Sequence, residues 1–380
     1  MPLPHEPIPD TAVSGRSRFA AAHAVLEQAI AESAFPGAAY GVLLGGEVVA
    51  LDAVGRQTYE AYSPVVAHDT IYDLASVTKV MATTAVAMWL YDRGQLDLNV
   101  PLGEVLPGFV IGEHHDPLRV RVTLRHLLAH SSGLPGYVRL FEAHRSPAAI
   151  MRAALETPLE AKPGSRAEYS DVGFILLGKA LEVLAGEKLD TLFSREIAAP
   201  LGLRSARFCP PHEWRTAIPP TELDTWYRKR LIEGEVQDEN CYALGGVSGH
   251  AGLFAHVPDV LRFAACILAQ GETFQGAQLF QPGTVELFAT REQTPPGTPR
   301  ALGWDTPGVP SSSGSYFGPR SIGHLGYAGT SLWIDRDRGL AIALLTNRTW
   351  PDRKAKLIQQ IRPRFHDAIQ DSIAGAISRI

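Results

Sequence analysis

The strand-forming segments of this 380-residue chain lie at its two ends. Near the N-terminus, the runs AAYGVLL and EVVALDAV are joined by Gly45 and Gly46, a two-residue connection that β-hairpin turns favour. Near the C-terminus, the runs SLWI and LAIALLT flank the segment from Asp335 to Gly339, which predicts a second hairpin. Because the pattern between the two hairpins is mostly helix and loop, we expect one antiparallel sheet built from both chain ends.

Helical patterns occupy much of the remaining sequence. Apolar residues recur with helical spacing from Phe19 to Ile30, and the segment DVGFILLGKALEVLAG carries a similar apolar stripe. The segments PAAIMRAALE and PDVLRFAACILAQG show the same spacing, and TLRHLLAH is a shorter example. Pro351 opens a C-terminal helical pattern, which Pro363 should kink or divide into two segments because proline removes a backbone donor.

These elements predict a mixed α/β (α+β) fold, in which helices flank the antiparallel sheet and an all-helical region is inserted into it. We expect residues 1–72 and 298–380 to form the sheet domain, and residues 73–297 to form a mostly helical domain. Residues 291–319, which include PPGTP and SSSGS, should be a long loop or a mobile flap.

Charge and composition limit the classes of molecule that could be the main binding partner. The formal net charge of −5 argues against nucleic acid or an anionic membrane as the main partner. No run of about 18 apolar residues predicts a membrane span, and the N-terminus lacks the pattern of an export signal. The chain as written is therefore expected in the cytoplasm, with an extracytoplasmic location left open if a signal has been removed. Composition does not indicate an oligomeric state.

Metal and disulfide sites are not indicated by the cysteines. Cys209, Cys241 and Cys266 form no C-x-x-C pair and are odd in number, so we expect buried free thiols. His126 and His130 lie four residues apart on a predicted helix, but no H-E-x-x-H glutamate accompanies them, which favours a structural role.

The segment ASVTKVMATTAVAMWLYDRG carries one lysine in an otherwise apolar helical pattern. The pattern runs from Ser76 to Arg93 and stops at Gly94. Lys79 would lie in the first turn, where the helix dipole disfavours a positive charge. Ser76 lies three residues earlier on the same face. A serine beside an easily neutralised amine is a candidate nucleophile beside its base.

Two further elements accompany this S-x-x-K pair: Tyr169-Ser170-Asp171 before the DVGF helix, and His324-Leu325-Gly326 before the GTSLWID strand. Together with RHLLAHSSGLP, YSDVGFILLG, GGVSGHAGLF and GHLGYAGTSLWID, they resemble the serine β-lactamase-related and penicillin-binding-protein-like hydrolases of the class C type. That family also holds DD-peptidases, esterases and muramyl-peptide amidases. The resemblance implies a β-lactamase/transpeptidase-like fold and no metal or organic cofactor.

The resemblance also implies roles for individual residues. Ser76 would attack a carbonyl group, with Lys79 and Tyr169 sharing the general-base role. The backbone N–H groups of Ser76 and of Tyr327, which follows Gly326, would bind the oxyanion. His324 of the third element would complete the catalytic set.

Substrate-binding candidates come from two places. Asp171 could bind a cationic or hydroxyl-bearing substrate, or serve only as the first-turn acid of its helix. The segment QDENCYALGGVSGHAGLF resembles the amidase branch and supplies Asn240 and His250, although His250 can equally fix a glycine-rich loop near the cleft.

Two departures from the β-lactamase pattern bear on specificity. His324 stands where a lysine is usual, and its imidazole is mostly neutral near pH 7, which weakens recognition of a β-lactam carboxylate. Asp171 stands where asparagine is more common, and its carboxylate should favour a charged Lys79 and disfavour a Tyr169 phenolate.

The sequence therefore predicts a serine acyl hydrolase that cleaves an amide or an ester through a Ser76 acyl-enzyme. A muramyl-peptide amidase or a small-ester carboxylesterase fits best, so the expected partner is a small molecule or a cell-wall fragment. The alternatives are a weak β-lactamase or DD-peptidase, and a protein that senses a penicilloyl group or a muropeptide without turnover.

Overall fold

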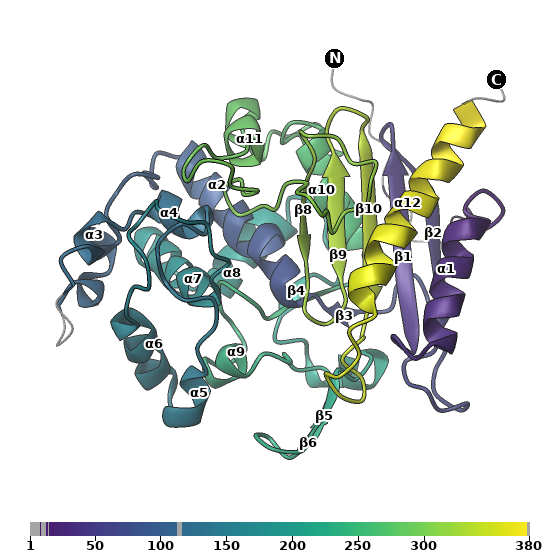
Figure 1. Cartoon of the computed structure of the whole chain (residues 1–380), viewed down its shortest axis with the longest axis horizontal. Helices are drawn as coiled ribbons and strands as arrows, with labels where there is room; N and C mark the ends of the chain where they lie inside the picture. Colours follow the sequence, from purple (N-terminus) through teal and green to yellow (C-terminus); the bar gives the residue numbers. More distant parts are fainter. Residues whose placement is uncertain (1–7, 9–12, 14, 112–115, 378–380) are drawn as a thin grey trace.

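The computed structural model describes residues 8, 13, 15–111 and 116–377. Its main sheet has five antiparallel strands in the order β2-β1-β10-β9-β8 (Figure 1). These strands are β1 (Gly37–Leu44), β2 (Glu47–Gly55), β8 (Ile322–Leu325), β9 (Ser331–Asp335) and β10 (Leu340–Thr346). Both predicted hairpins are confirmed, and β1 pairs with β10, so the sheet joins the two ends of the chain. The N-terminal stretch examined for an export signal lies mostly outside the described residues.

Helices cover both faces of this sheet. Helices α1 (Ala20–Ala31) and α12 (Ile358–Ile377) pack side by side on one face, where Tyr40 meets Phe365 with ring centroids 5.4 Å apart (Figure 1). Helix α10 (Val257–Leu268) covers the other face. A Cβ on Gly41 of β1 would lie 2.6 Å from a methyl group of α10, so glycine is what allows this close approach. Burial on both faces explains why β1 and β10 are almost continuously apolar.

The rest of the chain forms a mostly helical region beside the sheet (Figure 1). Its helices are α2 (Ala85–Asp92), α3 (Leu102–Val105), α4 (Leu124–Leu128), α5 (Leu140–Ala143), α6 (Pro147–Glu156), α7 (Asp171–Ala185), α8 (Leu189–Phe193), α9 (Glu239–Ala243) and α11 (Pro282–Ala289). Two small sheets complete it: β3 (Tyr72–Asp73), β4 (Arg207–Phe208) and β7 (Leu253–Ala255) form one, and β5 (Glu222–Asp224) and β6 (Arg230–Ile232) the other.

The domain boundaries at residues 72/73 and 297/298 stay a prediction. Helix α10 lies within residues 73–297, the range expected to form the helical domain, but it packs on the main sheet. Residues 291–319 contain no helix or strand, as expected for a long loop, and their mobility also stays a prediction. In the part of the chain that the structure describes, no helix has the length and apolar character needed to cross a membrane.

The C-terminal helix differs from the sequence prediction. It begins at Ile358 rather than near Pro351, and it continues through Pro363 as one helix instead of two segments. Proline removes one backbone hydrogen bond there, but the apolar stripe of α12, which includes Phe365 and Ile369, is buried against the sheet. That burial outweighs the lost bond and keeps the helix in one piece.

The segment that carries Ser76 and Lys79 is helical up to the predicted end at Gly94, but it is not one uniform α-helix. A 3₁₀ turn begins at Ala75, a π-helical stretch spans Lys79–Thr84, and only then does α2 begin. Ala75 has a left-handed φ of 47°, so Lys79 lies three residues after Ser76, the first right-handed residue that follows, and is the first residue of the π-helical stretch. Short π-helical stretches are frequent at functional sites because they shift side chains out of the regular helical register.

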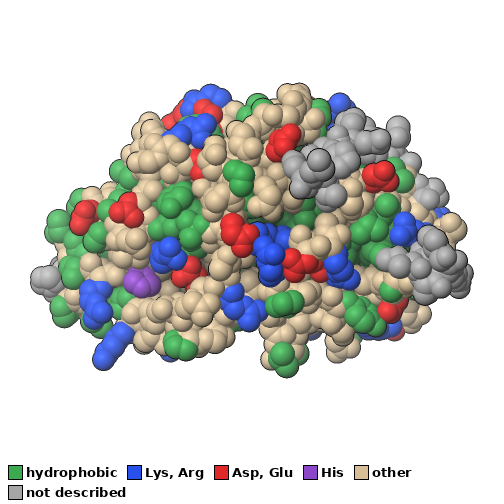
Figure 2. Space-filling view, turned by 90° about the horizontal axis from the view of Figure 1, so that it is seen from above, with side chains coloured by type: hydrophobic (Ala, Val, Ile, Leu, Met, Phe, Trp, Pro, Cys, Tyr) green, Lys and Arg blue, Asp and Glu red, His purple; other side chains and the backbone are tan. Residues whose placement is uncertain are grey.

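Charged side chains of both signs are interspersed over the face shown in Figure 2. Neither Lys and Arg nor Asp and Glu cover a large area of this face. The pattern agrees with the small net charge of −5, and this face offers no broad basic surface to a polyanion.

Candidate active site

Ser76 lies in a tight turn that Asp73 stabilises. The Oδ1 atom of Asp73 accepts a hydrogen bond from the amide of Ala75 at 2.8 Å, and its Oδ2 atom accepts one from the amide of Gln237, also at 2.8 Å. Ala75 has a φ of 47°, in the left-handed region that side chains with a Cβ rarely occupy. Such strain is typical of functional sites, and here it fixes the residue that precedes Ser76.

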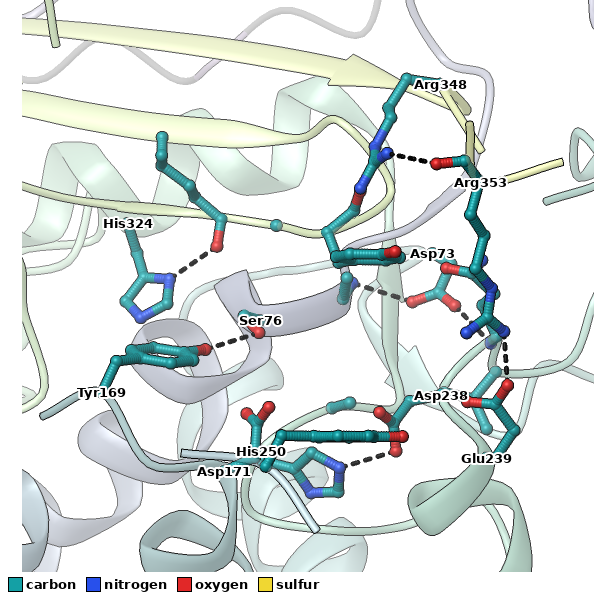
Figure 3. A pocket seen from close by; sticks show the side chains of 18 of the residues that line it. Asp73, Ser76, Tyr169, Asp171, Asp238, Glu239, His250, His324, Arg348 and Arg353 are labelled. Atoms are coloured by element: carbon teal, nitrogen blue, oxygen red, sulfur yellow. Dashed lines mark hydrogen bonds and ion pairs between the residues drawn. The ribbon is translucent and has the colours of Figure 1, made fainter. Parts of the chain in front are cut away.

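The first two sequence elements meet at the Ser76 hydroxyl. The Tyr169 hydroxyl donates to Ser76 Oγ at 2.7 Å (Figure 3). Lys79 Nζ donates to the same oxygen at 3.1 Å. The predicted nucleophile and both predicted bases are therefore in direct contact, although they lie up to 93 residues apart in sequence.

Lys79 is fully buried, with 0% of its surface exposed. Its ammonium donates to three acceptors: Ser76 Oγ, the carbonyl oxygen of His250 at 3.0 Å and Asp171 Oδ1 at 2.6 Å. Burial lowers the pKa of Lys79 below its usual value, and the charge of Asp171 opposes this effect without cancelling it. Asp171 thus favours the charged lysine, as expected, while burial rather than the helix dipole is the main cause of the lowered pKa.

Tyr169 is fixed by the start of helix α7. Ser170 caps this helix by accepting a hydrogen bond from the Gly173 amide at 3.0 Å, and its own amide donates to His130 Nδ1 at 3.0 Å. The His130 ring lies against Tyr169 with centroids 4.7 Å apart, which gives this histidine the structural role expected for it. Burial raises the pKa of Tyr169 well above its usual value, and the charge of Asp171 adds to the shift.

The third element forms the opposite wall of the site. Gly326 begins a turn in which the amide of Gly329 donates to the Gly326 carbonyl at 3.1 Å. Arg362 holds this turn from α12 by donating to the carbonyl oxygens of Gly326 at 2.5 Å and Thr330 at 2.8 Å. Among the described residues, none accepts a hydrogen bond from the Tyr327 amide, so this donor is available to a ligand.

His324 is buried and held in one orientation. Its Nδ1 atom lies 2.8 Å from the carbonyl oxygen of Leu325, which can only accept, so Nδ1 carries the proton. Burial lowers the pKa of His324 well below its usual value, and the nearby charge of Lys79 adds to this effect. The ring is therefore neutral, and its Nε2 atom, which has no hydrogen-bond partner in the described part of the chain, is an acceptor. An acceptor cannot replace the charged lysine in binding a carboxylate.

The two candidates from the QDENCYALGGVSGHAGLF segment differ in position. His250 lines the site and joins two polar groups: its Nε2 atom lies 2.7 Å from Asp238 Oδ1 and its Nδ1 atom 2.9 Å from Ser248 Oγ. Asn240 is not among the residues that line the cavity, and its place in the substrate-binding set stays a prediction. Its side chain holds a loop instead: Oδ1 accepts a hydrogen bond from the Phe141 backbone amide, and Nδ2 donates one to the Val138 carbonyl oxygen.

These residues surround a cavity of about 670 Å³. The cavity is lined by Ser76, Tyr169, Asp171, His250, His324, Gly326 and Tyr327 from the predicted set. Its walls also include residues that the sequence did not single out. Asp73 holds the nucleophile turn, Asp238 pairs with His250, and Arg300 lies over the Tyr169 ring at 5.5 Å from its centroid. For the part of the chain that is described, no group of His, Cys, Asp and Glu side chains is arranged to hold a metal.

The buried Asp73 carboxyl predicts a pH-dependent stability. Burial raises the pKa of Asp73 from about 3.8 to about 6, so between these values the folded protein binds more protons than the unfolded chain. The free energy of unfolding therefore falls by roughly 3 kcal/mol as pH rises through this window, because the protonated carboxyl no longer favours the folded state. Urea unfolding of wild type and Asp73→Asn at pH 4, 5, 6 and 7 should show the wild type losing stability relative to the variant. Parallel curves would contradict this prediction.

Gly326 has a steric requirement that can be tested directly. A Cβ at this position would lie 2.0 Å from Thr330 Oγ1 and 2.5 Å from the carbonyl oxygen of Leu74. Gly326→Ala should therefore displace the turn that carries the Tyr327 amide and lower kcat/KM by about 10²-fold, the usual effect of losing one oxyanion donor. Steady-state kinetics and Tm should be compared with Gly283→Ala, whose Cβ meets open space. Equal activity of the Gly326→Ala and Gly283→Ala variants would contradict the need for glycine at position 326.

The fold and the Ser–Lys–Tyr cluster define a serine hydrolase. A family model described as Beta-lactamase matches residues 22–362. The chain belongs to this family.

Similar proteins support the family assignment, and a solved structure supports the fold. "N-acetylmuramyl-L-alanine amidase" of Bacillus subtilis is 30% identical over 358 residues, covering 85% of this chain and 79% of the relative. "Putative D-alanyl-D-alanine carboxypeptidase" of Escherichia coli is 33% identical over 308 residues, covering 73% and 69%. The solved structure of EstCE1, a hydrolase with promiscuous acyltransferase activity, has a TM-score of 0.74 at 24% identity, covering 94% of this chain and 100% of that one. The predicted β-lactamase/transpeptidase-like fold is confirmed, and the protein is a serine acyl hydrolase.

Proposed function

We propose that Ser76 is the nucleophile and that the substrate is the amide of a muramyl peptide, a cell-wall fragment. The observation that carries the catalytic assignment is the pair of hydrogen bonds to Ser76 Oγ from Tyr169 and Lys79 at the cavity. The substrate assignment is supported by the relative named N-acetylmuramyl-L-alanine amidase, which aligns with 85% of this chain.

Acylation would begin when Lys79 has lost a proton. Ser76 Oγ attacks the carbonyl carbon while its proton passes to the Lys79–Tyr169 pair. The oxyanion that forms accepts hydrogen bonds from the backbone N–H groups of Ser76 and Tyr327. As the carbon–nitrogen bond breaks, the same pair returns the proton to the leaving amine. Water then attacks the acyl-enzyme and gives up a proton to the pair. As the bond between the acyl carbon and Ser76 Oγ breaks, the pair returns that proton to Ser76 Oγ and the acid is released.

Ester hydrolysis is a second candidate, and one observation favours it. The neutral His324 ring offers no charge to a substrate carboxylate, and a small neutral ester requires none. The same feature weakens recognition of β-lactams and of D-alanyl-D-alanine peptides, whose carboxylate lies beside the scissile amide. In a longer muramyl peptide the corresponding alanine carboxyl is part of the next amide bond. Rates on N-acetylmuramoyl-L-alanine, a p-nitrophenyl ester and nitrocefin would separate these activities. A muramyl amide should give the highest kcat/KM, and hydrolysis of the ester alone would contradict the amidase proposal.

Asp171 should set the pH dependence of the reaction. The base form of Lys79 is the deprotonated one, so kcat/KM rises as pH increases through the pKa of Lys79. Asp171 raises that pKa, against burial and the charge of Arg300, with a smaller contribution from Asp238. Asp171→Asn should therefore move the acid limb of the pH–rate profile to lower pH. An unshifted limb would contradict this assignment, and Asp337→Asn, in the exposed β9–β10 turn, serves as the control.

A further inference from the structure

One arm of the cavity is lined by aromatic side chains that the proposed acyl transfer does not use. Trp226 and Tyr137 line it and are each 44% exposed. Phe141 supports Trp226 from within the protein, with ring centroids 5.6 Å apart. The Arg139 guanidinium lies over part of the Trp226 ring, at 5.6 Å from its centroid, and the remaining exposed aromatic surface can be covered by the apolar face of a ligand.

The carboxylate of Asp238, which hydrogen bonds hold in place, also lines this cavity. Asp238 Oδ1 accepts a hydrogen bond from His250 Nε2 at 2.7 Å (Figure 3). It also accepts one from the Cys241 amide at 2.8 Å. Its Oδ2 atom has no hydrogen-bond partner among the described residues, and the side chain, which lines the cavity, remains 21% exposed. Although burial opposes ionisation, the pairing with His250 holds the pKa of Asp238 below its usual value. The cavity therefore contains a preoriented anionic acceptor.

Hydrogen bonds from Arg228 connect the chain segment that carries Trp226 to the segment that carries Asp238. Arg228, two residues after Trp226, donates to the carbonyl oxygens of Val236 and Gln237 at 2.7 and 2.5 Å, immediately before Asp238. Asp238 also lies near enough to Tyr137 to add to the increase in the pKa of its phenol, whose main cause is burial. Trp226 and Asp238 line the same cavity, and Arg228 links the two segments that carry them.

This combination fits a pyranose ring better than the other groups a substrate could present. A sugar ring has an apolar face of C–H groups and a rim of hydroxyl donors, which match an aromatic plane and a fixed acceptor. An alkyl chain would bury the Asp238 carboxylate without a partner, and a carboxylate would be repelled by it. An ammonium group would meet Arg139, which lies over the Trp226 ring at 5.6 Å from its centroid.

We propose that the arm formed by Tyr137, Phe141, Trp226 and Asp238 is a sugar subsite, in which a pyranose ring of the substrate stacks on Trp226 and donates a hydroxyl hydrogen bond to Asp238 Oδ2. The proposal rests on the proposed function, because it assigns the glycan part of the same substrate. It also separates a glycan-linked substrate from a simple peptide or ester.

Equilibrium binding tests this subsite without requiring catalysis. Isothermal titration calorimetry with methyl N-acetyl-β-D-glucosaminide should show saturable binding to the wild type. Trp226→Ala and Asp238→Asn should each weaken it on the order of ten-fold, whereas Trp226→Phe, which keeps an aromatic plane, should retain part of it. The control Tyr62→Ala, exposed and outside the cavity, should change nothing. Absence of saturable sugar binding, equal binding by all variants, or tighter binding of butylammonium in the same arm would each overturn the proposal.

Kinetics then connect the subsite to turnover. Trp226→Ala should lower kcat/KM for N-acetylmuramoyl-L-alanine about ten-fold but leave N-lactoyl-L-alanine, the same amide without the sugar, within about two-fold. An equal loss on both substrates would overturn the subsite. If neither amide is hydrolysed while the sugar still binds through Trp226 and Asp238, the muramyl-amidase proposal fails and the sugar subsite stands.

Discussion

Ser76→Ala is expected to lower kcat/KM by about 10⁴-fold or more on any amide or ester that the wild type cleaves, because no other hydroxyl can form the acyl-enzyme at this position. The loss should appear in kcat, since the cavity and its substrate-binding groups remain in place. Steady-state rates and Tm would be measured together, with Ser165→Ala, an exposed serine outside the cavity, as the matched control. A Ser76→Ala enzyme that keeps a substantial share of the wild-type rate would exclude the proposed nucleophile.

Lys79→Met is expected to lower kcat by about 10³-fold, within the usual contribution of a general base. The methionine side chain fills similar space but cannot take the Ser76 proton. It also leaves Asp171 without the ammonium that lies 2.6 Å from it, so a loss of stability is expected as well.

The double variant Lys79→Met/Asp171→Asn separates the two effects. It should recover Tm, because the unpaired carboxylate is gone, and yet remain inactive, because the base is still missing. Lys188→Met, a substitution of an exposed lysine just beyond the C-terminal end of α7, should behave as the wild type. Recovery of activity with Tm would contradict a catalytic role for Lys79.

The elements of the fold were predictable where a periodic pattern was long. The two hairpins needed only alternating or continuous apolar runs beside Gly45-Gly46 and Asp335 to Gly339, and α7 combined an apolar stripe with the Ser170 cap. The path of α12 was not predictable, because burial of Phe365 against the sheet decides whether Pro363 ends the helix.

The site was predictable only where residues form short motifs. Ser76, Lys79 and Tyr169 lie in recognisable elements, and their contacts follow. Asp73 and Arg300 lie in no such motif, and they reach the cavity through contacts between distant parts of the chain. Asp238 lies in the segment QDENCYALGGVSGHAGLF, but nothing in that segment singled it out as a residue of the cavity. Asn240 lies only two residues from Asp238, but its side-chain amide is hydrogen-bonded to the loop that carries Phe141 and Val138. Only the three-dimensional path of the backbone decides which of two neighbours faces the cavity.

The measurement that tests the central claim most directly is intact mass spectrometry during turnover of a p-nitrophenyl ester, with proteolytic mapping of the adduct. The account predicts one acyl group per chain, located on Ser76, present while substrate lasts and lost afterwards as water completes the reaction, with no adduct on Ser76→Ala. Many turnovers with no adduct and an undiminished Ser76→Ala rate would contradict acyl transfer through Ser76. A Ser76 adduct that persists without turnover would instead identify a sensor rather than a hydrolase.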